Sequence, residues 1–300
     1  MITTAPRAPT VLVTGATGTI GSRVVRELRD RRVRVRALVH HHALDPDLSD
    51  IGAVHGDLAD PIAVREAVSG VHTLFVACAN VPDQVALECG LIDAAHAAGV
   101  QRIVKLSAQG AEIGSPVAYW DWHARIEAHL ESSGIPAAVL RPSFLMSNLF
   151  AAAPQLRHTG SLIAPAAAAR ITMIDPADVA SAAVAALLDD RHDGRIHQLT
   201  GPVAVGYADV AAELTSVVGS PVGYVNVPGE AARQYLVGAG VPPFAADQVV
   251  RIFAQLRAGA QATPVDAVRA LVGRPSRAFA EFAADHAAAF RTPTPVSARG

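Results

Sequence analysis

Three glycines spaced three residues apart, Gly15, Gly18 and Gly21, follow a short apolar segment near the start of the sequence. Glycine lets a chain turn sharply and lets its backbone approach a phosphate group closely. A helix that begins directly after such a turn adds free N–H groups and the positive end of its dipole. We therefore interpret the segment as a site for the pyrophosphate of a dinucleotide. A tight turn with only a structural role is the alternative.

The elements on either side of these glycines come in the order that this chemistry requires. Val11–Val13 is uniformly apolar, which is typical of a buried parallel strand, and residues 22–31 carry apolar side chains at helical spacing. Strand, glycine turn and helix in that order open a dinucleotide-binding unit.

A run of three histidines, beginning with His40, ends the second expected strand. A carboxylate at this point would bind both ribose hydroxyls of NAD, and the sequence has neither Asp nor Glu there. Imidazole donates hydrogen bonds to a 2′-phosphate and is fully charged only near or below its pKa of about 6.5. We expect NADPH to bind better than NADH by a modest factor that grows as the pH falls. Arg36 either assists or points away, and a solvated histidine loop without a role is the alternative.

Apolar and helical segments alternate from the first strand to Pro142, which predicts a parallel sheet covered on both faces. The expected strands are 33–39, 53–56, 73–77, 103–106 and 137–140, and the expected helices are 61–68, 84–98 and 120–133. The fold class is therefore α/β, with a Rossmann-type doubly wound sheet and the ligand at the carboxyl ends of the strands.

The pattern loosens after Pro142. Helices are expected at 176–188 and 207–218 and strands at 196–199 and 223–227, followed by an Ala-rich helical part from 230 to 290 and a frayed tail after Arg291. We expect residues 1–150 to form the dinucleotide-binding domain, with 171–200 returning to it. Residues 151–300 then form mostly a small helical lobe that binds the substrate.

Composition excludes several classes of protein. The sequence has 300 residues, 51% of them hydrophobic, which suffices for one large domain with a small lobe. It has no apolar run of the roughly 18 to 20 residues that span a membrane, and no secretory signal is visible. A net charge of −2 argues against a nucleic-acid binder. Cys78 and Cys89 are too far apart for a C-x-x-C motif, so we interpret them as buried thiols and expect a cytoplasmic protein.

With these segments placed, the sequence resembles the atypical short-chain dehydrogenase/reductases of the NmrA-like group over nearly its whole length. The resemblance rests on residues 13–21, 35–39, 56–58, 106–110, 122–127, 133–134, 140–142, 174–179 and 199–202. It implies a Rossmann domain, a nicotinamide cofactor and a small substrate lobe. It leaves the reaction open, because the group includes quinone and carbonyl reductases as well as cofactor-sensing regulators.

The resemblance also implies which residues hold the cofactor. Asp57 corresponds to a carboxylate beside the adenine, although a helix cap or turn former is the alternative. The backbone after Arg141 corresponds to the segment that lies against the nicotinamide carboxamide. The full set is Gly15, Thr17, Gly18, Thr19, Ile20, Gly21, His40, Asp57, Leu58, Ala77, Ser107, His123, Pro142 and Phe144.

Ser107, Tyr119 and His123 are the candidate catalytic residues. Ordinary short-chain reductases combine a serine with a Tyr-x-x-x-Lys, in which the lysine lowers the pKa of the tyrosine. A free phenol has a pKa of about 10 and transfers protons poorly at neutral pH without a nearby cation. Here histidine replaces the lysine. Either Tyr119 is the acid beside His123, or Tyr119 is a loop aromatic and His123 holds the ribose; the pKa of a free imidazole also suits proton transfer near pH 7.

Lys105 is the only lysine of the chain and lies two residues before Ser107, so both side chains point to the same side of a strand. We expect the Lys105 side chain to extend to solvent rather than to take part in catalysis. The candidate substrate contacts are Trp120, Phe144 and Asn148, and Tyr235 and Phe244 are further aromatic candidates. Core packing is the alternative for each of these aromatic residues.

We therefore expect an NAD(P)H-dependent oxidoreductase that transfers hydride to a quinone, enone or other carbonyl of a small apolar or aromatic substrate. A quinone needs the least from the protein, because its reduced oxygen anion is comparatively stable and water can supply the proton. A dinucleotide-sensing regulator without turnover is the alternative. No metal, nucleic-acid or membrane partner is expected, and a homodimer stays open.

Overall fold

The computed structural model describes residues 10–40 and 44–291. These residues form two compact units. The first takes its residues from Met1–Pro142, Pro176–Leu199 and Asp266–Pro275, and the second from Ser143–Asp175, Thr200–Val265 and Ser276–Gly300. The division differs from the expected boundary at residue 150, because the second unit begins at Ser143 and a short segment after Val265 returns to the first.

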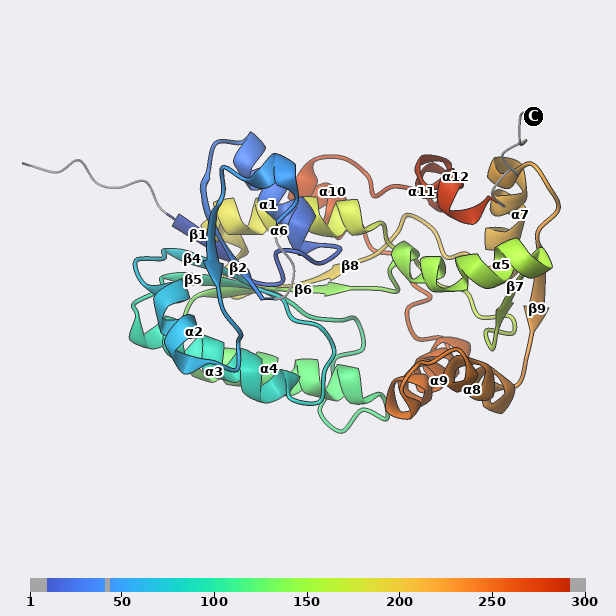
Figure 1. Cartoon of the computed structure of the whole chain (residues 1–300), viewed down its shortest axis with the longest axis horizontal. Coiled ribbons are helices and arrows are strands. Elements are labelled where there is room, and N and C mark those ends of the chain that lie inside the picture. The colour runs from blue at the N-terminus through green and yellow to red at the C-terminus, as the bar shows by residue number, and fades with distance from the viewer. Residues whose placement is uncertain (1–9, 41–43, 292–300) are drawn as a thin grey trace, which may run out of the picture. The chain divides into compact units, whose positions relative to one another are not determined.

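A parallel seven-stranded sheet forms the centre of the first unit (Figure 1). Its strands are β1 (Thr10–Val13), β2 (Arg34–Val39), β3 (Gly52–His55), β4 (Thr73–Val76), β5 (Arg102–Leu106), β6 (Ala137–Pro142) and β8 (Ile196–Leu199). Their order is β3-β2-β1-β4-β5-β6-β8, and every neighbouring pair is parallel. This is the doubly wound Rossmann order with one more strand, so the expected fold class is confirmed.

Helices cover both faces of this sheet (Figure 1). One layer contains α1 (Gly21–Asp30), α6 (Pro176–Leu188) and α10 (Ala267–Val272), and the other α2 (Pro61–Val68), α3 (Gln84–Ala97) and α4 (Ala118–Ser132). Two short 3-10 helices, η1 (Pro46–Leu48) and η3 (Asp190–His192), complete the unit. Local sequence fixes the helix starts: Asp60 accepts a hydrogen bond from the Ile62 N–H at 2.8 Å, and Pro61 occupies the first helical position.

The core on the α2–α4 side explains why the central strands are mostly apolar. Leu12, Leu74 and Ile103 are fully buried on three neighbouring strands, and they share one cluster with Leu91 and Ile126 of the covering helices. Strands buried on both faces carry runs of apolar residues instead of alternating apolar and polar ones. These apolar runs are the pattern that identified most of the strands in the sequence.

The second unit is mainly helical. Its two strands, β7 (Ser161–Ala164) and β9 (Gly223–Asn226), pair in parallel. Its helices are η2 (Met146–Ala152), α5 (Ala153–Thr159), α7 (Tyr207–Val218), α8 (Gly229–Gly238), α9 (Pro243–Arg257), α11 (Phe279–Asp285) and α12 (Ala287–Phe290). A hydrophobic cluster of aliphatic and aromatic side chains, including Phe253, Phe282 and Phe290, forms its core. The sequence patterns indicated α7 and β9 but no element between Ser143 and Asp175.

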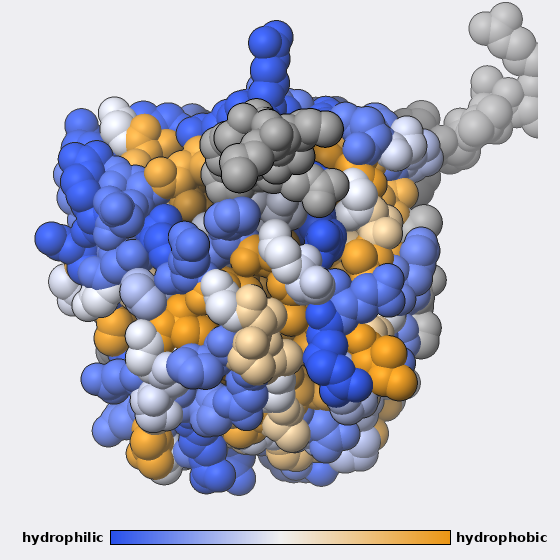
Figure 2. Space-filling model, turned by 90° about the vertical axis from the view of Figure 1, so that its left-hand side faces the viewer, coloured by the Kyte–Doolittle hydropathy of each residue, from blue (hydrophilic) through white to orange (hydrophobic). Residues whose placement is uncertain are grey.

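Among the described residues, no helix is long and apolar enough to cross a membrane. On the face shown in Figure 2, hydrophilic and hydrophobic side chains are interspersed. Cys78 and Cys89 are free thiols, and both are partly rather than fully buried.

Candidate cofactor and active site

The turn between β1 and α1 uses two of its glycines for its own backbone. Gly15 has a φ of +60°, a left-handed conformation that favours glycine. A Cβ on Gly21 would lie 2.1 Å from the Gly15 carbonyl oxygen, so no larger residue fits there. The Gly18 N–H donates to the same oxygen at 2.9 Å and closes the turn. The fold itself therefore requires Gly15 and Gly21.

Gly18 is glycine for a different reason. Its φ lies outside the left-handed region, and a Cβ would meet only the Gly15 oxygen, at 3.2 Å, with no other heavy atom within 4 Å. Gly18 is exposed, as are Thr17 and Thr19, while Ile20 is buried and offers a ligand only its backbone. The space in front of Gly18, at the start of α1, is what the pyrophosphate of a dinucleotide needs. The residues present thus fit the cofactor that the sequence indicates.

His40 and Asp57 form a pair at the ends of β2 and β3. The His40 Nε2 lies 3.2 Å from the Asp57 Oδ2, and each side chain is almost half exposed. Asp57 also accepts the Ala59 N–H at 2.9 Å, so it forms a turn as well as facing the histidine. Arg36 donates to the carbonyl oxygens of Ala67 and of Ser69 (2.7 Å each) and thus points away from His40. The other two histidines of the run lie outside the described residues.

The ends of β1 and β4 are joined beside the glycine turn. The Thr14 hydroxyl donates to the Ala77 carbonyl oxygen at 2.9 Å and accepts the Ala77 N–H at 2.9 Å. A Cβ on Gly15 would lie 3.0 Å from that same Ala77 oxygen. Ala77 therefore positions the turn, and its cofactor contact stays a prediction.

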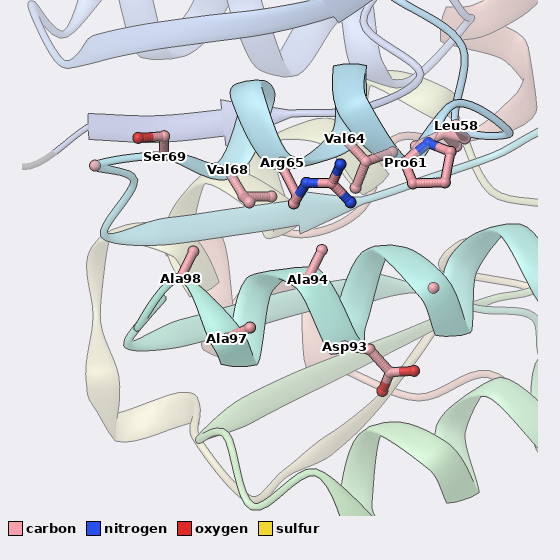
Figure 3. Close-up of a pocket in the computed structure, with 12 residues that line it drawn as sticks. Leu58, Pro61, Val64, Arg65, Val68, Ser69, Asp93, Ala94, Ala97 and Ala98 are labelled. Atoms are coloured by element: carbon pink, nitrogen blue, oxygen red, sulfur yellow. The ribbon is translucent and has the colours of Figure 1, made fainter.

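A groove of about 600 Å³ runs between α2 and α3 (Figure 3). Val64 and Val68 of α2 and Ala94 of α3 are among the side chains that line it, with Arg65 and Asp93 as its charged members. Leu58 is the one predicted cofactor residue along it.

The face between β5 and α4 brings two predicted site residues, Ser107 and His123, together with four side chains that the sequence analysis did not assign to the site. Lys105 and Ser107, two positions apart, contact His123 and Glu127, which are one helical turn apart on α4. Glu88 of α3 and Arg141 of β6 complete the face. The signal available in the sequence was this matched spacing, i and i+2 on a strand against i and i+4 on a helix.

Lys105 does not extend to solvent, and that expectation is wrong. Its side chain is 0% exposed, and its Nζ lies 2.8 Å from the Glu88 Oε2, which is also 0% exposed. The Nζ donates to the Leu106 carbonyl oxygen and lies 3.3 Å from the His123 Nδ1. Gln84 donates to the other Glu88 oxygen at 2.9 Å. Because α3 and α4 cover this face of the sheet, a side chain from β5 has no path to water.

His123 is a neutral group at neutral pH. It is 8% exposed, and burial, followed by the positive charges of Lys105 and Arg141, holds its pKa well below 6.5. The expectation that its pKa suits proton transfer near pH 7 is therefore wrong, and His123 cannot serve as a cation beside Tyr119. A neutral imidazole still donates one hydrogen bond and accepts another.

Ser107 has already committed its only hydroxyl hydrogen. Its Oγ donates to the Glu127 carboxylate, and the same carboxylate accepts the Arg141 Nε–H at 3.0 Å. Ser107 is buried, with 4% exposed. Toward a ligand, Ser107 therefore offers lone pairs and not a proton.

Tyr119 lies in the first turn of α4 rather than in a loop. Its ring packs against that of Trp122, with 5.4 Å between the ring centroids, and burial raises the pKa of its phenol above 10. A phenol with a raised pKa is a weak acid at neutral pH. Trp120 is 7% exposed and packs against Gly110, where a Cβ would lie 2.6 Å from its ring.

The remaining candidates belong to the second unit, apart from Pro142, whose carbonyl oxygen accepts the Gln109 N–H at 2.8 Å. The Phe144 ring lies 6.1 Å from that of Phe253, centroid to centroid, and its N–H donates to Gln261 at 2.8 Å. Asn148 is exposed on η2, and Tyr235 and Phe244 are exposed on α8 and α9. Substrate contacts by these residues stay predictions.

Comparison with known proteins gives one consistent result. The sequence model of the NmrA-like family matches residues 7–282. An NAD(P)H azoreductase from Xenophilus azovorans is 38% identical over 282 residues, which are 93% of this chain and 99% of that protein. A (4-alkanoyl-5-oxo-2,5-dihydrofuran-3-yl)methyl phosphate reductase from Streptomyces griseus is 35% identical, over 93% of this chain and 99% of that protein.

A solved structure extends this likeness to three dimensions. The NADPH-dependent quinone oxidoreductase of Escherichia coli in complex with NADPH superimposes with a TM-score of 0.84 at 28% identity, covering 92% of this chain and 99% of that one. The family match spans nearly the whole sequence, and the glycine turn and strand order are those of a dinucleotide-binding fold. The chain belongs to the NmrA-like family.

Proposed function

We propose that this protein is an NADPH-dependent oxidoreductase that transfers hydride to a quinone, enone or other carbonyl of a small apolar or aromatic compound. The observation that carries the substrate class is the state of the β5–α4 face. His123 is neutral, the Ser107 hydrogen is committed, and Tyr119 has a raised pKa. Among the residues that the structure describes, these three thus offer hydrogen bonds but no acid for use at neutral pH. A quinone is the hydride acceptor that needs no acid group from the protein, because water can protonate its reduced oxygen.

NADP(H) is the cofactor, and the first unit supplies its binding groups. The exposed turn at Gly18 would hold the pyrophosphate, and His40, half-exposed at the end of β2, would donate a hydrogen bond to the 2′-phosphate. Asp57 is the group for the adenine. His123 and Ser107 lie on the nicotinamide side, where one donates and the other accepts a hydrogen bond. When bound, the nicotinamide supplies a hydride.

The relatives support a reductase rather than a regulator. They are named as an azoreductase, as a quinone oxidoreductase and as a reductase of an oxo-dihydrofuran phosphate, and the chain matches each over more than nine-tenths of its length. A quinone takes up one hydride and one proton to become a hydroquinone. The bound cofactor would supply the hydride and water the proton, so the residues of this chain would serve to hold the nicotinamide and the quinone in the orientation for transfer.

The test is a screen of NADPH oxidation by the purified protein with quinones, enones, azo dyes and simple ketones. We expect quinones to be reduced fastest and simple ketones slowest. A Gly18→Val variant that has lost the cofactor is the control for background oxidation. Tight NADPH binding without turnover of any compound would favour the dinucleotide-sensing regulator instead.

The cytoplasmic location remains part of the proposal. It is supported by the two free thiols, which are typical of a reducing compartment. Fractionation of cells that produce the full chain checks it, and recovery with a membrane or secreted fraction would contradict it. Assembly into a homodimer stays open and is decided by the mass of the purified protein in solution.

A further inference from the structure

Three acceptors surround the Nζ of Lys105, which is the only lysine of the chain. They are the Glu88 Oε2 at 2.8 Å, the Leu106 carbonyl oxygen, and the His123 Nδ1 at 3.3 Å. An ammonium has three N–H donors and no lone pair, so this surrounding matches its capacity. Gln84 donates to the second Glu88 oxygen, so both oxygens of this carboxyl group face N–H donors. Lys105 and Glu88 thus form an ion pair in which both side chains are fully buried.

This surrounding decides where the proton of the His123 ring resides. An ammonium cannot accept a hydrogen bond, so the Nδ1 that faces it must be the unprotonated ring nitrogen. A neutral imidazole carries its single proton on the other nitrogen, Nε2. Within the described part of the chain, no group forms a hydrogen bond with this Nε2.

We propose that Lys105, neutralised by Glu88, is a positioning residue that locks His123 as the Nε2–H tautomer and so provides a hydrogen-bond donor that does not change with pH. The inference deepens the proposed function, since the donor would serve the cofactor or the quinone oxygen. The tautomer itself, however, is a property of the chain alone. It can therefore be tested whether or not the protein turns over a quinone.

The charges around the imidazole explain why it does not titrate near neutrality. Lys105 faces it from β5 and Arg141 is close on β6, and both oppose a third positive charge. The nearby carboxylates are already paired, Glu88 with Lys105 and Glu127 with Arg141. Burial and the Glu88 carboxylate raise the pKa of the Cys78 thiol to about 11, so this thiol near the Lys105–Glu88 pair stays neutral.

The direct test measures the ¹⁵N chemical shifts of the two His123 ring nitrogens by long-range ¹H–¹⁵N NMR of the labelled full chain. The signals are assigned by their loss in His123→Gln. We expect an unprotonated Nδ1 and a protonated Nε2, unchanged between pH 8 and pH 5.5. The partly exposed His129 is an internal reference within the same sample. A protonated Nδ1, or conversion of His123 to an imidazolium in this range, overturns the proposal without any variant.

The variant test removes the charges as a pair, because one buried charge alone would disturb folding. Lys105→Met combined with Glu88→Gln keeps the volume and leaves no net charge behind. We expect His123 in this variant to show a mixture of tautomers and to titrate closer to pH 6.5. The matched control is Gln84→Met, which removes a hydrogen bond to Glu88 but leaves the Lys105 Nζ and its three acceptors in place. It should keep the native tautomer. An unchanged tautomer in the paired variant contradicts the positioning role.

Activity and binding then separate this inference from the proposed function. In the paired variant we expect NADPH affinity or kcat/KM with a quinone to fall about fivefold to tenfold, the value of one oriented hydrogen bond, and to become pH-dependent below pH 7. If the native chain has the fixed Nε2–H tautomer but does not reduce quinones, the proposed function is refuted and the inference stands. If the native chain reduces quinones but His123 is a mixture of tautomers, the inference is refuted and the function stands.

Discussion

The turn after β1 and the face between β5 and α4 belong to the same sheet, but they present polar groups in opposite ways. The turn exposes backbone, and the one glycine that the fold does not require, Gly18, is open to solvent. The β5–α4 face buries ionised side chains, and each has a partner of opposite charge. One segment suffices to shape a surface for a phosphate. A donor of fixed protonation needs charges from several elements, because only an enclosed pair can hold a buried charge.

The largest effect should follow from breaking the buried pair. Lys105→Met leaves the Glu88 carboxylate buried without its cation, which costs about 3–5 kcal/mol of the free energy of unfolding. Urea denaturation measures it. The paired change of Lys105→Met with Glu88→Gln should recover most of the loss. A single variant as stable as the native chain would show that the pair is not formed.

A substitution at Gly18 in the turn should lower the affinity for NADPH and leave the stability of the fold nearly unchanged. Gly18→Val places a side chain where only the Gly15 oxygen lies nearby, so the fold should survive. NADPH affinity should fall at least about 100-fold, or about 3 kcal/mol, because the side chain fills the space of the pyrophosphate. Calorimetric titration measures the affinity and thermal melting the fold.

Gly21→Ala is the matched change in the same turn. Its Cβ would lie 2.1 Å from the Gly15 oxygen, so this variant should lose stability first. If Gly18→Val instead bound NADPH with native affinity, the cofactor site would be misplaced.

The free energy of unfolding should depend on pH through the buried His123, with an effect of about 1 kcal/mol. The pKa of His123 is depressed in the folded protein, so below pH 6.5 the unfolded chain binds a proton that the folded one does not. The free energy of unfolding should therefore fall by about 1 kcal/mol as the pH drops from 7 to 5.5. Urea titrations at both values measure it, with His123→Gln as the comparison. An equal slope in both proteins would assign the effect to other histidines.

His40 should contribute less, because its pair with Asp57 is almost half exposed. Exposed charge contacts contribute about 0.2–1 kcal/mol, so His40→Ala should reduce the preference for NADPH over NADH by at most about fivefold. Parallel titrations with both cofactors at pH 6 and pH 8 test this. Tighter binding of NADH by the native chain at either pH would contradict the expected preference.

Tyr119→Phe should give the smallest effect. Burial raises the pKa of this phenol, so the hydroxyl is a poor acid at neutral pH. We expect kcat with a quinone to change less than about twofold. A loss of 10² to 10⁴ with unaltered cofactor affinity, the usual effect of a positioned acid, would restore Tyr119 as the proton donor.

Local patterns were sufficient for the elements and for the glycine turn. The apolar runs identified β1, β4 and β5 because strands buried on both faces carry few polar positions, and the buried exception in β5, Lys105, is paired with Glu88. Asp60 and Pro61 identified the start of α2, since a cap acts within one turn of the helix. The segment from Ser143 to Asp175 was missed because its helices and strand are short and build their core with residues far along the chain.

The sequence by itself determined the Rossmann fold, the cofactor turn and the absence of a lysine after Tyr119, because each depends on neighbouring residues. Only the tertiary structure decided what Lys105 and His123 do. A lysine near the end of a strand goes to solvent or into a buried pair according to what covers the sheet, and here α3 brings Glu88 to it. The protonation of His123 follows from that contact, because the electrostatics of a buried group depend on neighbours that are distant in sequence.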